Sequence, residues 1–133
     1  MFFQDLIRQL ARELGLPALL PDADGICAIR FDGLSFCLRD LGRQVVLVSC
    51  WVGRLDPRDR CTQERLLAGN LMPEQVGVAI LGMDASGDVY LSGHLDCAQL
   101  TFPTFLVRLE QVVDAAAYWS GCFGASRPVL AVH

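Results

Sequence analysis

The sequence has no cluster of basic residues and no long apolar run. Its 11 Lys and Arg residues, against 15 Asp and Glu, are scattered one at a time, and the formal net charge is −4. A nucleic-acid surface needs a concentrated basic footprint, so binding to nucleic acid is excluded. Every apolar stretch is broken by Arg, Asp, Gln or Gly before the roughly 20 residues that span a bilayer, which excludes membrane insertion.

The N-terminal residues also lead us to expect no secretory leader. The first five residues contain no basic side chain, and Asp5 and Arg8 interrupt the apolar residues around them. Signal peptides combine a positively charged start with an unbroken apolar segment. We therefore expect the protein to stay in the cytoplasm.

Motifs for metals and nucleotide cofactors are absent. The six cysteines, at positions 27, 37, 50, 61, 97 and 122, include no CxxC pair, whereas structural zinc sites use closely spaced Cys or His pairs. Neither GxxxxGK[ST] nor GxGxxG occurs. We expect no metal and no cofactor, and we interpret the cysteines as reduced, mostly buried apolar side chains.

Few residues could act as a catalytic base. The sequence has two histidines, and one of them, His133, is the last residue. One enzymatic alternative stays open, in which a cysteine acts as nucleophile with His94 as its base. Nothing selects the cysteine or an orienting acid. The carboxylates occur singly in turn-like segments, so the sequence predicts no catalytic residue.

Apolar side chains, in contrast, are abundant. They make up 53% of the chain and charged residues only 20%, which excludes a disordered protein. The length predicts one domain, for which we set the bounds 1–125, followed by a loosely attached tail at 126–133. A domain of this size has a high ratio of surface to volume, so surplus apolar surface indicates burial against a partner.

Helical spacing and alternation predict the elements of the first half. Phe3 to Leu14 has an apolar stripe of helical period, and Gly15 and Pro17 end that helix. Strands at 27–31 and 34–39 alternate on either side of a tight turn at Asp32-Gly33. A third strand at 45–52 is apolar on both faces, which is typical of a central strand or of one that a partner covers.

The second half adds a helix, two strands and a long helix. Thr62 is the predicted cap of a helix that runs to Leu71 and stops before Pro73. Strands follow at 76–83 and 89–95, and a strongly periodic helix runs from Thr101 to about Cys122. The order of helix, three strands, helix, two strands and helix predicts an α+β fold with a mainly antiparallel, twisted sheet.

Five stretches in this order carry a resemblance to a known family. They are LARELGLP at 10–17, GICAIRFDG at 25–33, LLAGNL at 66–71, ILGMDASGDVYL at 80–91 and FLVRLEQVVDAAAYW at 105–119. In this pattern the chain resembles the class I type III secretion chaperones of bacteria, often called the Tir-chaperone family. The resemblance covers nearly all of residues 3–122.

The resemblance implies a cytoplasmic homodimer without enzymatic activity that holds the N-terminal segment of a secreted effector protein. The dimer contact it implies includes Leu66, Leu67, Asn70 and Leu71. The groove for the effector is expected to include Phe3, Ile7, Leu10, Phe31, Phe36 and Leu38. A regulatory protein that binds through the same fold and couples secretion to expression remains an alternative.

Overall fold

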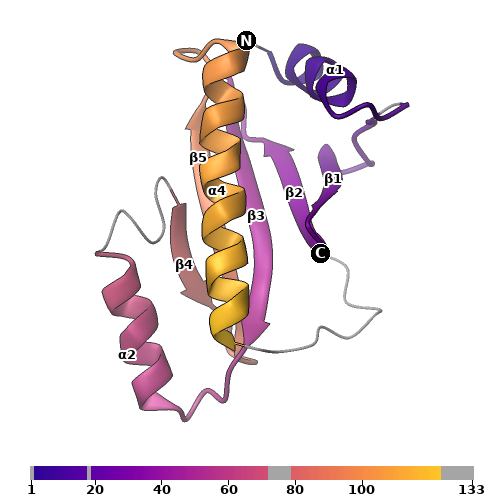
Figure 1. Ribbon diagram of the computed structural model, residues 1–133. Coiled ribbons are helices and arrows are strands. Elements are labelled where there is room, and N and C mark those ends of the chain that lie inside the picture. The colour runs from indigo at the N-terminus through magenta and orange to yellow at the C-terminus, as the bar shows by residue number, and fades with distance from the viewer. Residues whose placement is uncertain (1, 18, 72–78, 124–133) are drawn as a thin grey trace.

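The computed structural model describes residues 2–17, 19–71 and 79–123. These ranges form a five-stranded antiparallel sheet and three helices in the expected order, so the α+β prediction is confirmed. Figure 1 shows the arrangement. The elements are α1 Phe3–Glu13, β1 Ile26–Phe31, β2 Leu34–Asp40, β3 Val45–Arg54, α2 Arg60–Gly69, β4 Ala79–Met83, β5 Asp88–Asp96 and α4 Phe102–Phe123.

The sheet has the order β1-β2-β3-β5-β4, so β1 and β4 are its two edge strands. The β1–β2 hairpin turns at Asp32 and Gly33, which both have positive φ, 51° and 82°. This is the geometry of a two-residue type I′ turn and confirms the predicted hairpin. The tight turn fixes the register in which Phe31 pairs with Leu34.

Helix α4 lies along one face of the sheet, over β3 and β5 (Figure 1). Its inward side chains recur every three or four residues, the spacing of one face of a helix. Each is buried, with at most 7% of its surface exposed. They are Phe105, Leu109, Val112, Ala115, Ala116 and Trp119.

Helix α1 buries its predicted stripe in the same core and ends as expected. Gly15 has φ +68°, the Gly15 N–H donates to Arg12 O, and the Leu16 N–H donates to Ala11 O. This pair of hydrogen bonds is the Schellman ending, which requires a left-handed residue at the glycine position. It turns the chain sharply after the helix and thereby fixes the positions of Leu14 and Leu16.

Two predictions of element ends were wrong. Helix α2 begins before Thr62, because the Asp59 carboxylate is the cap: it accepts the Thr62 N–H at 3.1 Å and the Thr62 hydroxyl at 2.7 Å. Strand β3 continues past Val52 to Arg54 through an irregularity in its register between Trp51 and Gly53. A bulge of this kind lets pairing with β5 resume after one extra residue.

Several predictions fall outside the described residues. These are the start of the fourth strand at 76–78, the helix stop at Pro73 and the tail at 126–133. None of the helices in the described ranges is both long and apolar enough for a membrane span.

Candidate functional site

The outer edge of β1 has backbone groups that no described residue pairs. The Ile26 N–H donates to Asp22 Oδ1 at 3.1 Å and the Ile26 carbonyl accepts the Asp22 N–H at 3.0 Å, on the side away from β2. Backbone groups along a strand alternate in direction, so those of Ala28 and Arg30 also point outward. No backbone hydrogen bond from the described residues reaches these groups. Within residues 2–17, 19–71 and 79–123, strand β1 therefore presents an open edge.

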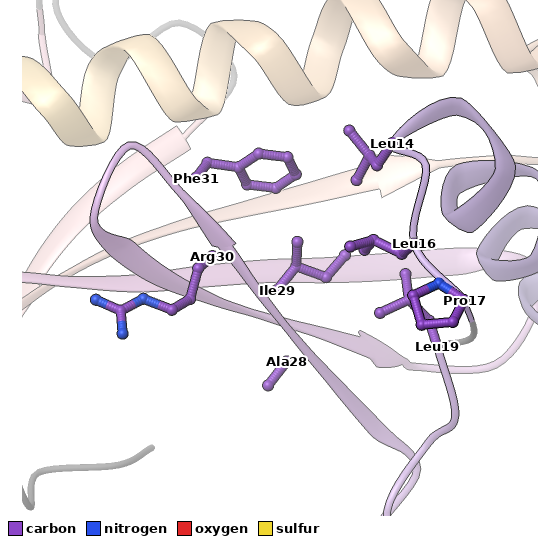
Figure 2. A pocket seen from close by; sticks show the side chains of 8 residues that line it. All are labelled: Leu14, Leu16, Pro17, Leu19, Ala28, Ile29, Arg30 and Phe31. Atoms are coloured by element: carbon purple, nitrogen blue, oxygen red, sulfur yellow. The ribbon is translucent and has the colours of Figure 1, made fainter.

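An apolar groove of about 390 Å³ adjoins this edge. Figure 2 shows leucines of the α1–β1 connection facing Ile29 and Phe31 of the strand, while the Arg30 side chain points away. Leu14 and Leu16 remain 37% and 38% exposed. The groove is lined by Leu14, Leu16, Pro17, Leu19, Ala28, Ile29, Arg30 and Phe31.

Two further grooves continue the first in both directions. One, of about 440 Å³ against α1, shares Leu16, Pro17 and Leu19 with it. The other, of about 410 Å³ between α1, the β1–β2 turn and α4, shares Leu14 and Phe31. We call these three joined grooves the apolar track. Apolar concave surfaces with a few polar groups are the usual form of binding sites.

The six predicted groove residues occupy different depths. Phe31 is half-buried and lines two grooves of the track, whereas Ile7 and Leu10, 2% and 0% exposed, form part of the floor of the outer two. The others lie in the core and line none of the three grooves: Phe3, Phe36 and Leu38. The Phe36 ring supports Phe31 from below, with ring centroids 5.5 Å apart in an edge-on arrangement. Their part in binding stays a prediction.

The exposed lining of the track was missed at the level of sequence. Gly15 and Pro17 were interpreted only as a helix stop, and the leucines that follow Gly15 were given no role. Yet Leu16, Leu19 and Leu20 are apolar residues in a connection where polar turn residues are usual, and Leu20 is 82% exposed. That excess of leucine was the available signal.

A second apolar surface lies at the opposite edge of the sheet, on α2 and β4 (Figure 1). Leu67, Leu71 and Ile80 are 70%, 81% and 59% exposed. Of these three, Leu67 lines a groove of about 200 Å³, together with Gln63, Leu66, Asn70, Leu81, Gly82 and Met83. Within the predicted dimer set, Leu67 and Leu71 are exposed, Leu66 is buried in the core, and Asn70 bonds to its own chain. The dimer contact itself stays a prediction.

This second edge differs from β1 in its hydrogen bonding. The Asn70 amide donates to the Leu81 carbonyl at 3.1 Å, and the Leu81 N–H donates to Asn70 Oδ1 at 2.7 Å. The side chain thus takes the place that a neighbouring strand would occupy at the centre of β4. Strand addition is blocked there, while the outward groups at Ala28 and Arg30 stay accessible.

The structure does not bring His94 together with Cys50, one of the six candidate nucleophiles of the enzymatic alternative. His94 is exposed on β5 opposite Leu47 of β3, while Cys50 of β3 pairs with Leu91 and is buried toward the core. Burial raises the pKa of the Cys27 and Cys97 thiols, with nearby carboxylates Asp22 and Asp96 adding to the effect. Activated cysteines need the opposite shift. In the described ranges no three His, Cys, Asp or Glu side chains gather as metal ligands.

An open strand edge beside a continuous apolar track is the arrangement of proteins that bind an extended segment of another chain. The comparisons with known proteins agree with this class. The chain belongs to the Tir chaperone protein (CesT) family, whose model matches residues 5–120. No curated protein sequence matches the chain.

Solved structures of similar fold include three complexes. The ExsC–ExsE complex has a TM-score of 0.74 and 25% identity, covering 96% of this chain and 94% of that chain. The HopA1–SchA chaperone–effector complex has 0.73 and 23%, covering 90% and 93%. The type III secretion chaperone SycH of Yersinia pestis with a fragment of YscM2 has 0.69 and 20%, covering 89% and 99%.

Proposed function

We propose that this chain is a type III secretion chaperone of the bacterial cytoplasm. It binds the N-terminal chaperone-binding segment of an effector and keeps that segment soluble and competent for export. Membership of the Tir chaperone family supports the chaperone class. Two of the similar structures are a chaperone–effector complex and a type III secretion chaperone in complex with a protein fragment, which supports a client of this kind.

The observation that carries the proposal is the open edge of β1 beside the apolar track. A client segment in extended form pairs with the outward backbone groups of Ala28 and Arg30 and adds a strand to the sheet. Its alternate side chains then enter the groove lined by Leu14, Leu16 and Phe31. Main-chain hydrogen bonds supply affinity and the grooves supply selectivity in this mode of recognition.

The protein acts as a homodimer in this proposal, through the second apolar surface. Leu67, Leu71 and Ile80 are exposed on the segments at the edge of the sheet away from the track, and in this proposal they form the apolar patch of the dimer contact. Burying such a patch against its copy removes apolar area from water at about 25 cal/mol per Å². The client site and the dimer contact then lie on different edges, so each can be occupied without the other. Catalysis and a bound cofactor have no part in this role.

Strand addition is tested by replacing Ala28. Ala28→Pro removes the outward N–H, and proline is tolerated on an edge strand when that N–H faces solvent. Ala28→Thr keeps the N–H and suits a strand, so it is the matched control. The probe is a set of N-terminal segments of secreted effectors, each co-expressed with the full chain.

Light scattering then gives the mass of each complex, and titration gives its affinity. We expect the native chain to hold one segment and Ala28→Pro to weaken binding about tenfold, the loss of a well-formed hydrogen bond. Ala28→Thr should bind like the native chain. A chain that takes up no effector segment contradicts the proposal, and one that instead holds a regulator of expression supports the regulatory alternative.

A further inference from the structure

The groove of the apolar track nearest α4 carries charge of one sign around an apolar floor. Its floor consists of Leu10, Leu14, Phe31, Leu106, Leu109 and Val113. Four carboxylates complete the lining, namely Glu13, Asp32, Glu110 and Asp114, and no Lys or Arg lines this groove. All four are exposed.

Within the described part of the chain, these four carboxylates form no ion pair. The ion pairs there are Arg8–Asp5 and Arg58–Asp56, and none of the four takes part in them. Glu110 and Asp114 are four residues apart and therefore neighbours on one face of α4. Their negative charges add over the same groove.

The opposite end of the track has a different charge. The groove against α1 is lined by Arg8 and Arg12, and Arg8 is paired with Asp5 at 3.3 Å. The negative potential is therefore local to the end where Phe31 meets α4. A uniformly acidic surface would not distinguish one end of a bound segment from the other.

We propose that this groove takes an apolar side chain of the client that is flanked by lysine or arginine. The inference rests on the proposed function and adds to it the charge of the bound segment at one end of the track. The apolar side chain rests on the leucines, and the flanking cations reach the four carboxylates. Charge of this kind adds specificity more than affinity, and it fixes the position of a segment that apolar contacts alone would let slide.

The experiment uses three labelled 13-residue peptides with leucine at three alternate positions in a serine and glycine background. The central leucine is flanked by two lysines, two glutamines or two glutamates. Binding to the full chain is followed by fluorescence anisotropy at low and high salt. The test variant is Glu110→Gln with Asp114→Asn, and the matched control is Asp24→Asn with Glu64→Gln, which makes the same change in net charge away from the groove.

We expect the lysine peptide to bind about tenfold more tightly than the glutamate peptide, with the glutamine peptide between them, as two exposed ion pairs allow. High salt should reduce the difference. The test variant should lose the preference and the control should keep it. Three equal affinities overturn the charge selection and leave the proposed function standing, whereas no binding of any peptide counts against both.

Two other occupants of the groove would also overturn the inference. If the test variant changes the mass of the free protein, a second copy of the chain fills the groove. If Arg127→Gln, which removes the lone arginine of residues 124–133, strengthens binding of all three peptides, the chain's own C-terminal segment fills it.

Discussion

Asn70 and Leu81 are joined by two hydrogen bonds at the centre of the outer edge of β4. The Asn70 Nδ2 donates to the Leu81 carbonyl at 3.1 Å, and its Oδ1 accepts the Leu81 N–H at 2.7 Å. One side chain thus ties the end of α2 to the sheet and satisfies two backbone groups of an edge strand. Edge strands left open are sites of unwanted strand pairing, and a side chain that covers them prevents it.

Replacing Asn70 should therefore weaken the fold. Asn70→Ala leaves both Leu81 groups without a protein partner, and we expect a loss of about 1–2 kcal/mol in the free energy of unfolding. Urea unfolding followed by circular dichroism measures it. Glu64→Ala, an exposed change on the same helix, should stay within about 0.5 kcal/mol of the native chain. Equal stabilities of the two variants would show that the Asn70 bonds are replaced by water at no loss.

Gly69 is the point where α2 rests on Trp119 of α4. A Cβ at Gly69 would lie 2.5 Å from Trp119 Cζ2, and Trp119 is 1% exposed. Gly69→Ala should therefore destabilise the protein by about 1–3 kcal/mol, the range for overpacked cores. Gly121→Ala is the control, because nothing lies within 4 Å of its Cβ position. It should stabilise α4 by about 0.5–1 kcal/mol, and opposite signs for the two variants are the expected result of thermal unfolding.

The cap of α2 makes stability depend on pH. Hydrogen bonds from the Thr62 hydroxyl and then from its N–H lower the pKa of Asp59 below the ordinary 3.8. Because the folded-state pKa is lower than the unfolded one, the contribution is complete above 3.8 and is lost as the pH falls through the folded-state value. Asp59→Ala should lower Tm at pH 7.

That decrease in Tm should become smaller at a pH below the folded-state pKa of Asp59, because the protonated carboxyl group keeps an acceptor oxygen but loses its charge. Asp59→Asn keeps an acceptor for Thr62 without the charge, so it should lose less stability than Asp59→Ala at pH 7. Thermal unfolding across acidic and neutral pH separates these cases. A Tm difference that is constant with pH would mean that the carboxylate charge of Asp59 contributes nothing.

The proposed dimer predicts a change of mass when its apolar patch becomes charged. Leu67→Asp with Ile80→Asp places two carboxylates where the exposed Leu67 of α2 and Ile80 of β4 are expected to be buried, and we expect a monomer by light scattering. Val107→Asp alters an exposed apolar residue of α4 that is 53% accessible, and it should leave the mass unchanged. A dimer that survives the double change would place the contact elsewhere.

The six thiols should differ widely in reactivity. All six cysteines are thiols outside any disulfide, and Cys61 is exposed whereas Cys27, Cys50 and Cys97 are buried. Burial also raises the pKa of the Cys27 and Cys97 thiols, so their reactive thiolate forms are rare near neutral pH. Timed alkylation with mass spectrometry should label Cys61 first and these two only on unfolding. A single hyper-reactive thiol that depends on His94 would instead revive the enzymatic alternative.

Sequence reasoning succeeded where the information is local. The end of α1 at Gly15, the turn at Asp32-Gly33 and the buried stripe of α4 each depend on residues a few positions apart, and the structure confirms all three. The predicted start of α2 was wrong because Asp59 and Thr62, three positions apart, are both of a residue type that caps helices. The hydrogen bonds between them decide which one is the cap.

The binding site was harder to predict than the elements. An apolar stripe shows that a side chain is to be buried, but it does not show whether its own chain or a partner covers it. For this reason Phe36 and Leu38 were predicted to line a groove, although both are 0% exposed and lie in the core. Leu14 was assigned only to the apolar stripe of the first helix, and Leu16 and Leu19 were overlooked because a connection has no period to reveal them. Their shared groove appears only when the Schellman turn brings them beside β1.

The sequence by itself determined the order of helices and strands, the antiparallel hairpins and the family pattern, because spacing and turn residues act within short stretches of chain. Only the tertiary structure decided which edge of the sheet is open and where the charges gather. Asn70 closes β4 through a contact eleven residues along the chain, and Glu13, Asp32, Glu110 and Asp114 meet around one groove from three separate segments. Such contacts depend on how the packed elements meet, which no local pattern encodes.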